Sequence, residues 1–471
     1  MFAALTLTSP AAASPPVEKA RLFVLTDIEA DPDDTQSLIR LLLYANEIDV
    51  EGLVATTSVH QKNRIAPESI GRVIAEYAKV HANLALHDSA YPTAAALRSL
   101  IGRGQPIYGM AGVGAGKDTD GSRRLVAALS KPDKRPLWVS VWGGANTLAQ
   151  ALHTIRATRS PSEAKRLVSK LRVYTISDQD DSGTWIRKQF PELFYVVSPG
   201  GYGAATWTGI NQVVDGIDNN TVSNGWLAQH VQQGHGPLGA AYPDVAYGME
   251  GDTPSFLGLV PNGLNVPERP DWGGWGGRYS LRVPDLASMD PKGFTGGVPI
   301  LPETRPIWTN AVDKVIPYTA KPHFRAIGPS DKSYTGYRET IWRWRDDFQN
   351  DFAARMDWTT RKPADANHPP VVRLAHSDRL TVKSGESVVL SALGTTDPDG
   401  DSLSYWWFQY PEAGTLASPI ALWAAENLYA TGFTAPAVQR PEQVHFILRV
   451  TDKGAPALSR YRRVVVTIQP R

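Results

Sequence analysis

The sequence of 471 residues contains no cysteine. This absence excludes disulfide bonds, thiol catalysis and cysteine-based zinc sites together. The sequence also lacks an excess of either charge, since 48 Lys and Arg residues stand against 47 Asp and Glu residues and leave a net charge of +1. Because no overall field attracts a polyanion, we expect neither nucleic acid nor a membrane surface as a partner.

Long hydrophobic runs are absent as well, and no stretch approaches the roughly 20 apolar residues that cross a bilayer. The N-terminus has a shorter apolar segment, residues 2–7, followed by small residues at 11–14. That order is typical of a secretory signal, although no basic residue precedes the apolar segment. The sequence therefore predicts a secreted or periplasmic protein in which residues 1–20 are a signal segment or a disordered arm.

From residue 21 onward the pattern alternates between strands and helices. Residues 22–25 form a continuous apolar run typical of a buried parallel strand, and apolar residues at helical spacing follow it. Further strands are expected at residues 50–57, 137–142 and 171–176, and a helix is expected at residues 67–80. This alternation predicts an α/β fold with a doubly wound, mainly parallel sheet over residues 21–358, including an aromatic-rich C-terminal extension.

The rhythm of the sequence changes after residue 358. Residues 359–370 are polar and contain proline, which indicates a linker. Residues 371–471 read as short strands separated by turns, which predicts a β-sandwich of immunoglobulin type. Of the pair Trp406 and Trp407, one ring should point into the core and the other outward, because successive side chains of a strand alternate.

Five carboxylates stand in the turn that follows the first strand: Asp27, Glu29, Asp31, Asp33 and Asp34. So many like charges repel one another and are costly to bury, and a bound cation would offset that repulsion. Oxygen-rich clusters of this kind suit Ca²⁺ or Mg²⁺. The alternative is that Asp33 or Asp34 only caps the following helix while the other carboxylates are solvated.

Further polar and aromatic residues are candidates for binding a substrate. Ligands of doubly wound sheets bind at the carboxyl ends of the strands, so we expect Asn146, Asp178 and His60 to line that cleft. The alternatives are that Asp178 belongs to an acidic cap of the next helix and that His60 is an ordinary surface or core histidine. Trp272 and Trp275 are candidates for stacking on a sugar, because the two glycines between them leave the neighbouring rings exposed.

Several motifs together resemble a known family. An N-terminal strand followed by Asp-x-Asp-Pro-Gly-x-Asp-Asp and a helix is the signature of the nucleoside hydrolases, and residues 27–34 look like a variant of it. The accompanying motifs lie at residues 141–148, 176–183, 250–256, 272–279 and 341–346. This combination is similar to a family of secreted microbial proteins labelled cellulose-binding and nucleoside-hydrolase-like, and it covers nearly the whole chain after residue 20.

The resemblance implies a nucleoside hydrolase-like site in which Ca²⁺ carries the attacking water. By position in the motif, Glu29 would bind the metal and accept the proton of that water, and Asp33 would hold a sugar hydroxyl. Asp34, the remote Asp252 and the backbone carbonyl of Trp142 would complete the metal ligands.

The acid of the reaction differs from that of many nucleoside hydrolases, because Gly251 stands where they have a histidine that protonates the leaving base. Glu250 therefore becomes a candidate acid, with Asp178 as an alternative. Two carboxyl groups, one protonated and one ionised, are the usual apparatus for hydrolysing a glycosidic bond. The prediction is a Ca²⁺-dependent glycoside hydrolase-like protein acting on a plant or microbial carbohydrate. The alternatives are a non-catalytic protein that binds cellulose or another oligo- or polysaccharide, and a nucleoside N-ribohydrolase, and the oligomeric state stays open.

Overall fold

The computed structural model describes residues 18–199, 202–215, 217, 219–285, 298, 302–321, 326–416 and 418–471. The predicted signal segment lies outside the described residues, apart from residues 18–20. Within these ranges, no helix is both long and apolar enough to cross a membrane. The chain divides into two compact units. The α/β unit comprises Lys19–Val260 and Asn265–Asn367, and the C-terminal unit comprises Pro261–Leu264 and His368–Arg471.

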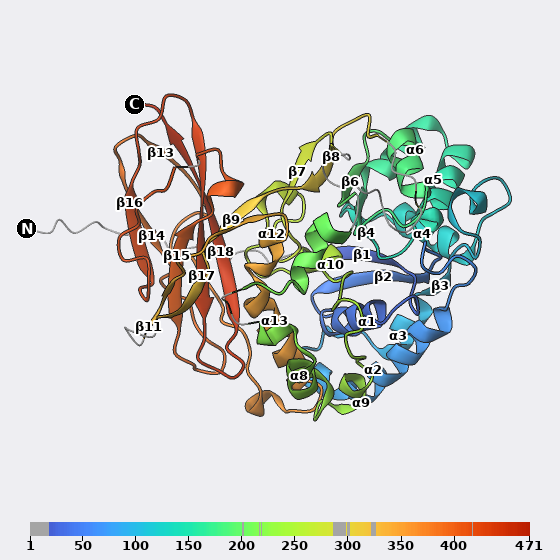
Figure 1. Ribbon diagram of the computed structural model, residues 1–471, viewed down its shortest axis with the longest axis horizontal. Helices are drawn as coiled ribbons and strands as arrows, with labels where there is room; N and C mark the ends of the chain where they lie inside the picture. Colours follow the sequence, from blue (N-terminus) through green and yellow to red (C-terminus); the bar gives the residue numbers. More distant parts are fainter. Residues whose placement is uncertain are drawn as a thin grey trace, which may run out of the picture. The chain divides into compact units, whose positions relative to one another are not determined.

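An eight-stranded sheet organises the α/β unit (Figure 1). Its strands run in the order β3-β2-β1-β4-β5-β6-β8-β7, and all neighbouring pairs are parallel except β7 and β8. The strands are β1 (Ala20–Thr26), β2 (Ile48–Ala55), β3 (Ile101–Arg103), β4 (Leu137–Val141), β5 (Leu171–Thr175), β6 (Phe194–Val197), β7 (Tyr279–Arg282) and β8 (Ile307–Asn310). The predicted doubly wound, mainly parallel sheet is confirmed.

Helices connect the parallel strands. The first seven are α1 (Asp33–Leu43), α2 (Pro67–His87), α3 (Ala94–Ser99), α4 (Asp120–Ser130), α5 (Asn146–Thr158), α6 (Pro161–Ser169) and α7 (Ser182–Gln189). The later ones are α8 (Asn224–Leu227), α9 (Gly236–Ala240), α10 (Pro254–Leu257), α12 (Glu339–Trp342) and α13 (Arg345–Asp357). The helix expected at residues 67–80 continues to His87, because residues 81–87 contain neither Gly nor Pro to end it.

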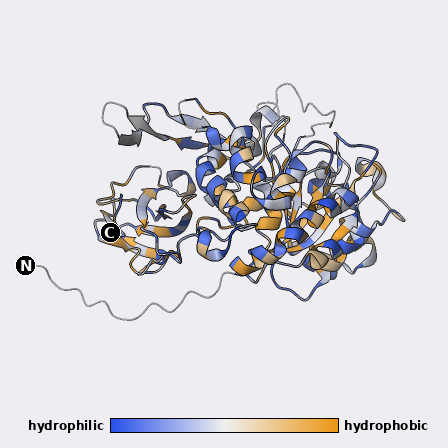
Figure 2. Cartoon of the chain, turned by 90° about the horizontal axis from the view of Figure 1, so that it is seen from below, coloured by the Kyte–Doolittle hydropathy of each residue, from blue (hydrophilic) through white to orange (hydrophobic). Residues whose placement is uncertain are grey.

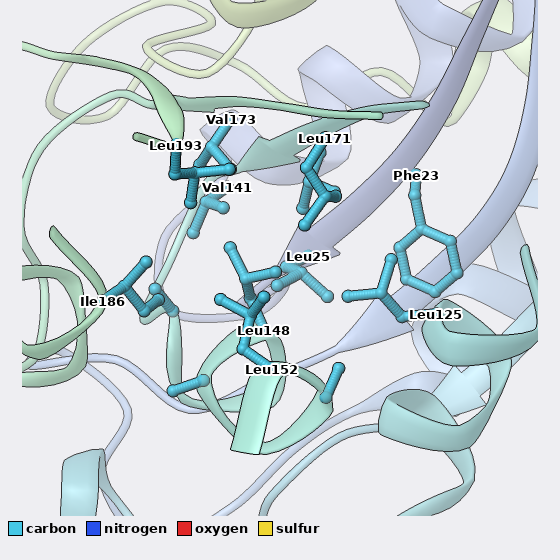
Figure 3. Close-up of a cluster of buried hydrophobic side chains, with 14 of the residues drawn as sticks. Phe23, Leu25, Leu125, Val141, Leu148, Leu152, Leu171, Val173, Ile186 and Leu193 are labelled. Atoms are coloured by element: carbon cyan, nitrogen blue, oxygen red, sulfur yellow. The ribbon is translucent and has the colours of Figure 1, made fainter. Parts of the chain in front are cut away.

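Apolar side chains fill the space between the sheet and its helices. Figure 3 shows Leu25 of β1 and Val141 of β4 facing Leu148 and Leu152 of α5. Hydrophobic residues are concentrated along these strands and the helix faces that cover them (Figure 2). Burying each such side chain contributes roughly 1.5–3 kcal/mol, so this layer fixes the strand order on which the site depends.

A glycine in β2 marks a tight contact with β1. A Cβ atom at Gly52 would lie 2.2 Å from the ring of Phe23, so no other residue fits at this position without movement. The register between the two strands shifts between Leu22 and Phe23, next to this contact. The glycine therefore lets the Phe23 ring lie against the neighbouring strand.

Smaller strand pairs follow β8 in the chain. They are β9 (Asp313–Val315) with β12 (Tyr334–Gly336), and β10 (Tyr318–Lys321) with β11 (Ala326–Pro329). Helix α13 then returns to the interior of the α/β unit with Phe348 and Phe352 fully buried.

The C-terminal unit is a β-sandwich. One layer has the order β13-β18-β17-β15 and the other pairs β14 with β16. The strands are β13 (Arg379–Lys383), β14 (Ser387–Ser391), β15 (Ser404–Gln409), β16 (Ala430–Thr434), β17 (Glu442–Thr451) and β18 (Ser459–Gln469). Trp407 packs in the core of this unit, whereas Trp406 is only partly buried, so the expected alternation of the two rings is confirmed.

Candidate functional site

The site lies where the strand order of the large sheet reverses. Strands β1 and β4 are neighbours, although β2 and β3 come between them in sequence. Such a reversal opens a crevice at the carboxyl ends of the two strands. Asp27 follows β1 and Gly143 closely follows β4, and a Cβ atom at Gly143 would lie 2.6 Å from Oδ1 of Asp27. Only glycine lets the Asp27 carboxylate pack against this loop.

Three carboxylates gather near the carboxyl ends of these strands. Asp33 and Asp34 begin helix α1, and Asp252 lies in the turn before α10. One oxygen from each of the three lies within 4.8 Å of the others. Asp34 accepts a hydrogen bond from the Thr26 hydroxyl, whereas Oδ2 of Asp252 is buried with no hydrogen-bond partner among the described residues. The chain thus joins its first acidic turn to a residue more than 200 positions later, as predicted.

The electrostatics of this group favour a positive ligand. Burial, followed by repulsion from neighbouring carboxylates, raises the pKa of Asp33, Asp34 and Asp252 well above the usual range. Burial also raises the pKa of Asp27, and the charge of Asp31 adds to that rise. All these donors are oxygens, and one of them is unpaired, so the residues fit a hard divalent cation such as Ca²⁺.

Glu29 does not join this group, which corrects its predicted role. Its carboxylate pairs with Arg64, with Nη1 to Oε2 at 3.0 Å, and also with Arg72 and the Ser69 hydroxyl. These partners lower the pKa of Glu29, with the Ser69 hydrogen bond as the largest cause. The backbone of Glu29 has a φ of 78°, which belongs to the left-handed region, and the side chain is directed to the two arginines. Asp31 lies next to the acidic group, because its Oδ1 accepts from the backbone N–H of Asp33 at 3.0 Å. After burial, its charge adds to the rise in the pKa of Asp33 and Asp252.

Glu250 is also wrong as the predicted acid. Its side chain is fully buried, and Oε2 lies 2.5 Å from Nε of Arg40. Tyr242 donates to Oε1 at 2.5 Å, and Thr253 donates to Oε2 at 2.8 Å. Both carboxylate oxygens are therefore used inside the protein, and Glu250 acts as a structural anchor for the turn that holds Asp252.

The predicted substrate contact of Asn146 is wrong for the same reason, and Asp178 also has a partner inside the protein. The Asn146 side chain is fully buried, donating to the Thr57 hydroxyl at 2.9 Å and accepting from the Thr56 hydroxyl at 2.9 Å. Asp178 accepts two hydrogen bonds from Arg187, at 2.8 Å and 2.7 Å. The Asn146 side chain ties the strand ends together, whereas Asp178 is partly exposed, so its contact with a substrate stays a prediction.

The alternative of an acidic cap on the next helix holds at Asp180, two residues after Asp178. Asp180 accepts from the backbone N–H of Ser182 at 2.9 Å, at the first residue of α7, and from that of Asn146 at 3.2 Å. Burial raises the pKa of Asp180 to about 6. The acid therefore supports the helix start and the loop after β4 together.

Trp272 and Trp275 are not at the crevice surface, contrary to prediction. Their side chains are 2% and 0% exposed. Trp275 packs edge-on against Phe348 of α13, and Arg269 stacks over Trp272 at 4.5 Å from the ring centre. Gly274, one of the two glycines between them, serves close packing, since a Cβ atom there would lie 2.1 Å from Oδ1 of Asn265.

Two other aromatic residues lie beside the acidic group, together with His60. A Cβ atom at Gly251 would lie 2.8 Å from Oδ2 of Asp33 and 2.9 Å from the Trp207 ring, so both border the same backbone. Tyr202 packs edge-on against Trp207 with ring centres 5.3 Å apart, and its hydroxyl bonds to Nε2 of His60. After burial, the charges of Asp27 and other aspartates of the group raise the pKa of Tyr202 further. We call His60, Tyr202 and Trp207 the aromatic rim.

Of the aromatic rim, His60 was predicted, whereas Tyr202, Trp207 and one amide were missed from the sequence. Tyr202 stands in a Gly-rich segment that indicates only a turn or cleft wall, and Trp207 has no motif around it. Gln179 donates from Nε2 to the Trp142 carbonyl at 2.7 Å, while its Oε1 is buried with no partner among the described residues. The Trp142 carbonyl retains a second lone pair, so its role as a metal ligand stays a prediction.

The fold and the site define a class: a nucleoside hydrolase-like α/β unit with an acidic group at its strand reversal, joined to a β-sandwich. Residues 21–279 match the family model described as the nucleoside hydrolase-like domain of cellulose-binding Sde182, and residues 387–468 match that of the C-terminal domain of cellulose-binding protein Sde0182. The chain belongs to this Sde182 family of cellulose-binding, nucleoside hydrolase-like proteins.

Comparison with solved structures agrees with this assignment. A nucleoside hydrolase-related hypothetical protein from Saccharophagus degradans, described as associated with carbohydrate metabolism, is 35% identical with a TM-score of 0.80. That match covers 96% of this chain and 100% of the other. The effector protein XOO4466 is a distant match, with 11% identity, a TM-score of 0.34, and coverage of 62% of this chain and 88% of that protein. Comparison with curated protein sequences gives no match.

Proposed function

We propose that this protein is a Ca²⁺-dependent hydrolase of a glycosidic bond in a carbohydrate, acting outside the cytoplasm. The observation that supports this proposal most is the buried, unpaired Oδ2 of Asp252 within 4.8 Å of carboxylate oxygens of Asp33 and Asp34. The carbohydrate is suggested by the family description and by the Saccharophagus relative, which is associated with carbohydrate metabolism.

Asp34 and Asp252 would hold the cation, with Asp33 and the Trp142 carbonyl as further oxygen donors. A bound divalent cation lowers the pKa of a coordinated water and so supplies a nucleophile at neutral pH. Neutralising the carboxylates would also remove the repulsion that raises their pKa values.

The chain's own side chains would handle the protons and the sugar. Asp31, half-buried beside Asp33, would accept the proton of the attacking water while the water oxygen bonds to the anomeric carbon. As the bond from that carbon to the leaving oxygen breaks, His60 would donate a proton to the leaving oxygen. The Trp207 ring would pack on the sugar, and its Nε1, buried without a partner among the described residues, would donate to a hydroxyl.

Release of reducing sugar from a panel of plant and microbial oligosaccharides tests the proposal, with Ca²⁺ or with a chelator. Turnover should require the cation, and Asp31→Asn should reduce it by at least about 10²-fold, in line with the loss of a general base. Glu29→Gln is the matched control from the same turn and should retain most of the activity. Turnover that survives the chelator and Asp252→Asn would count against the proposal.

A second candidate is carbohydrate binding without turnover. The observation that favours it is the internal pairing of Glu250, which occupies both oxygens of the acid predicted for the leaving group. Calorimetric titration with the same oligosaccharides would then give saturable, cation-dependent binding and no product. A nucleoside N-ribohydrolase is distinguished by release of free base from inosine or uridine.

A further inference from the structure

The two-stranded layer of the C-terminal unit has an outer face without charge. Along β14 and β16 the inward positions are buried, as at Leu390 and Phe433, which are 0% and 1% exposed. Directly opposite pairs such as Val389 and Gly432 point to the other side. The six outward positions are Ser387, Val389, Ser391, Ala430, Gly432 and Thr434. None of these six is charged, and three have hydroxyl groups.

Trp423 covers the centre of this face. Trp423 forms a β-bridge with Gly432, and its backbone N–H donates to the Gly432 carbonyl at 3.0 Å. The carbonyl of Trp423 accepts from the Thr431 hydroxyl at 2.5 Å. A Cβ atom at Gly432 would lie 2.1 Å from Cζ2 of Trp423, so the indole lies directly over the glycine. An aromatic ring that covers a strand glycine is a known way of stabilising such a position.

The indole is exposed although it is held in place. Trp423 is 54% exposed, and it is the one tryptophan in the described residues that is exposed and not buried or partly buried. Val389, opposite Gly432, is 58% exposed. Contact of this exposed ring with an apolar partner would be favourable, because it removes apolar surface from water.

We propose that the outer face of the β14–β16 layer binds the pyranose rings of a neutral polysaccharide, with Trp423 as the stacking platform. The C–H face of a pyranose is flat and apolar and matches one indole ring, and its hydroxyls can bond to Ser387, Ser391 and Thr434 at the edges. The absence of charge at the six outward positions favours a neutral chain over an acidic one. This surface is independent of the acidic site, since it lies wholly within the C-terminal unit.

Retention tests this proposal on the full chain. Binding is measured by sedimentation with insoluble cellulose and by affinity electrophoresis in a soluble neutral β-glucan, with polygalacturonate as the acidic comparison. Trp423→Ala should weaken binding to the neutral polymers by about tenfold, and Trp423→Phe should weaken it less, because a smaller ring remains. Val389→Asp should also weaken binding, because it places a charge beside the ring.

Tyr247→Ala is the control for removing an exposed aromatic ring, because Tyr247 is 88% exposed in the α/β unit. It should bind like the parent protein. Repeating the series in an Asp252→Asn background separates this surface from the proposed active site, since the Trp423 effect should persist there. Unchanged retention of both Trp423→Ala and Val389→Asp, or equal binding to polygalacturonate, would overturn the proposal.

Discussion

Oδ2 of Asp252 is buried and has no hydrogen-bond partner among the described residues, which distinguishes a ligand site from a set of packed acids. An unpaired buried acceptor costs about 1–3 kcal/mol, and a charged one costs more. Asp34, by contrast, accepts a hydrogen bond from the Thr26 hydroxyl. A cation at Oδ2 of Asp252 would remove this cost, so the residue should respond to metal more than its neighbours do.

The first prediction concerns this residue. Ca²⁺ should raise the melting temperature of the parent protein, because a ligand bound only to the folded state stabilises it. Asp252→Asn and Asp34→Asn should abolish that increase, since each removes a charged oxygen donor. Melting curves recorded over a range of Ca²⁺ concentrations check this, and an unchanged shift in both variants would contradict it.

The second prediction concerns Glu29. Glu29→Gln should keep the Ca²⁺-dependent increase in melting temperature, because the Glu29 carboxylate binds Arg64 and Arg72 and not the acidic group. The free energy of unfolding should fall by about 0.2–1 kcal/mol, the range for partly exposed ion pairs. Urea denaturation measures the cost, and loss of the Ca²⁺ response would restore Glu29 as a ligand.

At the scale of elements, the ion pair of Arg40 and Glu250 joins the first helix to the turn that holds Asp252. Arg40 lies on α1, stacks 3.9 Å from the ring centre of Phe352 on α13, and donates to the Phe348 carbonyl at 3.2 Å. Glu250 has a φ of 50°, a left-handed conformation held by these contacts. The pair therefore fixes three segments that are distant in sequence.

The third prediction follows from that pairing. Glu250→Gln should lower the free energy of unfolding by about 3–5 kcal/mol, because Arg40 would keep a buried charge without compensation. In a separate cycle, changing both Arg40 and Glu250 to Met should cost less than the sum of Arg40→Met and Glu250→Met. Urea denaturation of the three variants gives the interaction energy directly, and additive costs would show that the pair is not coupled.

Element positions were predictable from the sequence, while side-chain directions were not. The apolar runs of β1, β4 and β5 are typical of buried strands and fit no amphipathic helix. These strands were therefore predicted to within a few residues. Strand β16 has no comparable run, because Ala-Thr-Gly-Phe-Thr is short and weakly patterned. The roles of Glu29 and Glu250 were wrong because their partners, such as Arg40, come from other parts of the chain and no local spacing reveals them.

At the scale of the whole molecule, the raised pKa values give a dependence of stability on pH. Without divalent cations, Asp33, Asp34 and Asp252 keep protons in the folded state at a pH where the unfolded chain has released them, and Asp180 does so up to about pH 6. The unfolded state then binds fewer protons, so the free energy of unfolding falls as pH rises. Glu29, whose pKa is lowered, has the opposite effect only at lower pH.

The fourth prediction is that, with a chelator present, stability decreases as pH rises from about 5 to about 7. Ca²⁺ should reverse most of this decrease, because it binds the ionised carboxylates more strongly than protons do at the higher pH. Urea midpoints at several pH values, with chelator or with Ca²⁺, check the sign. A midpoint that increases with pH in the chelator would contradict the raised pKa values.

The chain enters the C-terminal unit twice, first at the short segment Pro261–Leu264 and again from His368 onward. The short segment belongs to the C-terminal unit, where the Asn262 carbonyl accepts from the backbone N–H of Tyr461 at 2.9 Å and the Leu264 carbonyl accepts from Arg463 at 3.0 Å. Gly263 passes so close to β18 that a Cβ atom there would lie 1.9 Å from the Tyr461 carbonyl. A protease cut between residues 359 and 370 would therefore leave residues 261–264, which belong to the sandwich, on the other fragment. A gene split at that point would deprive the sandwich of this segment, two of whose carbonyls accept hydrogen bonds from its last strand.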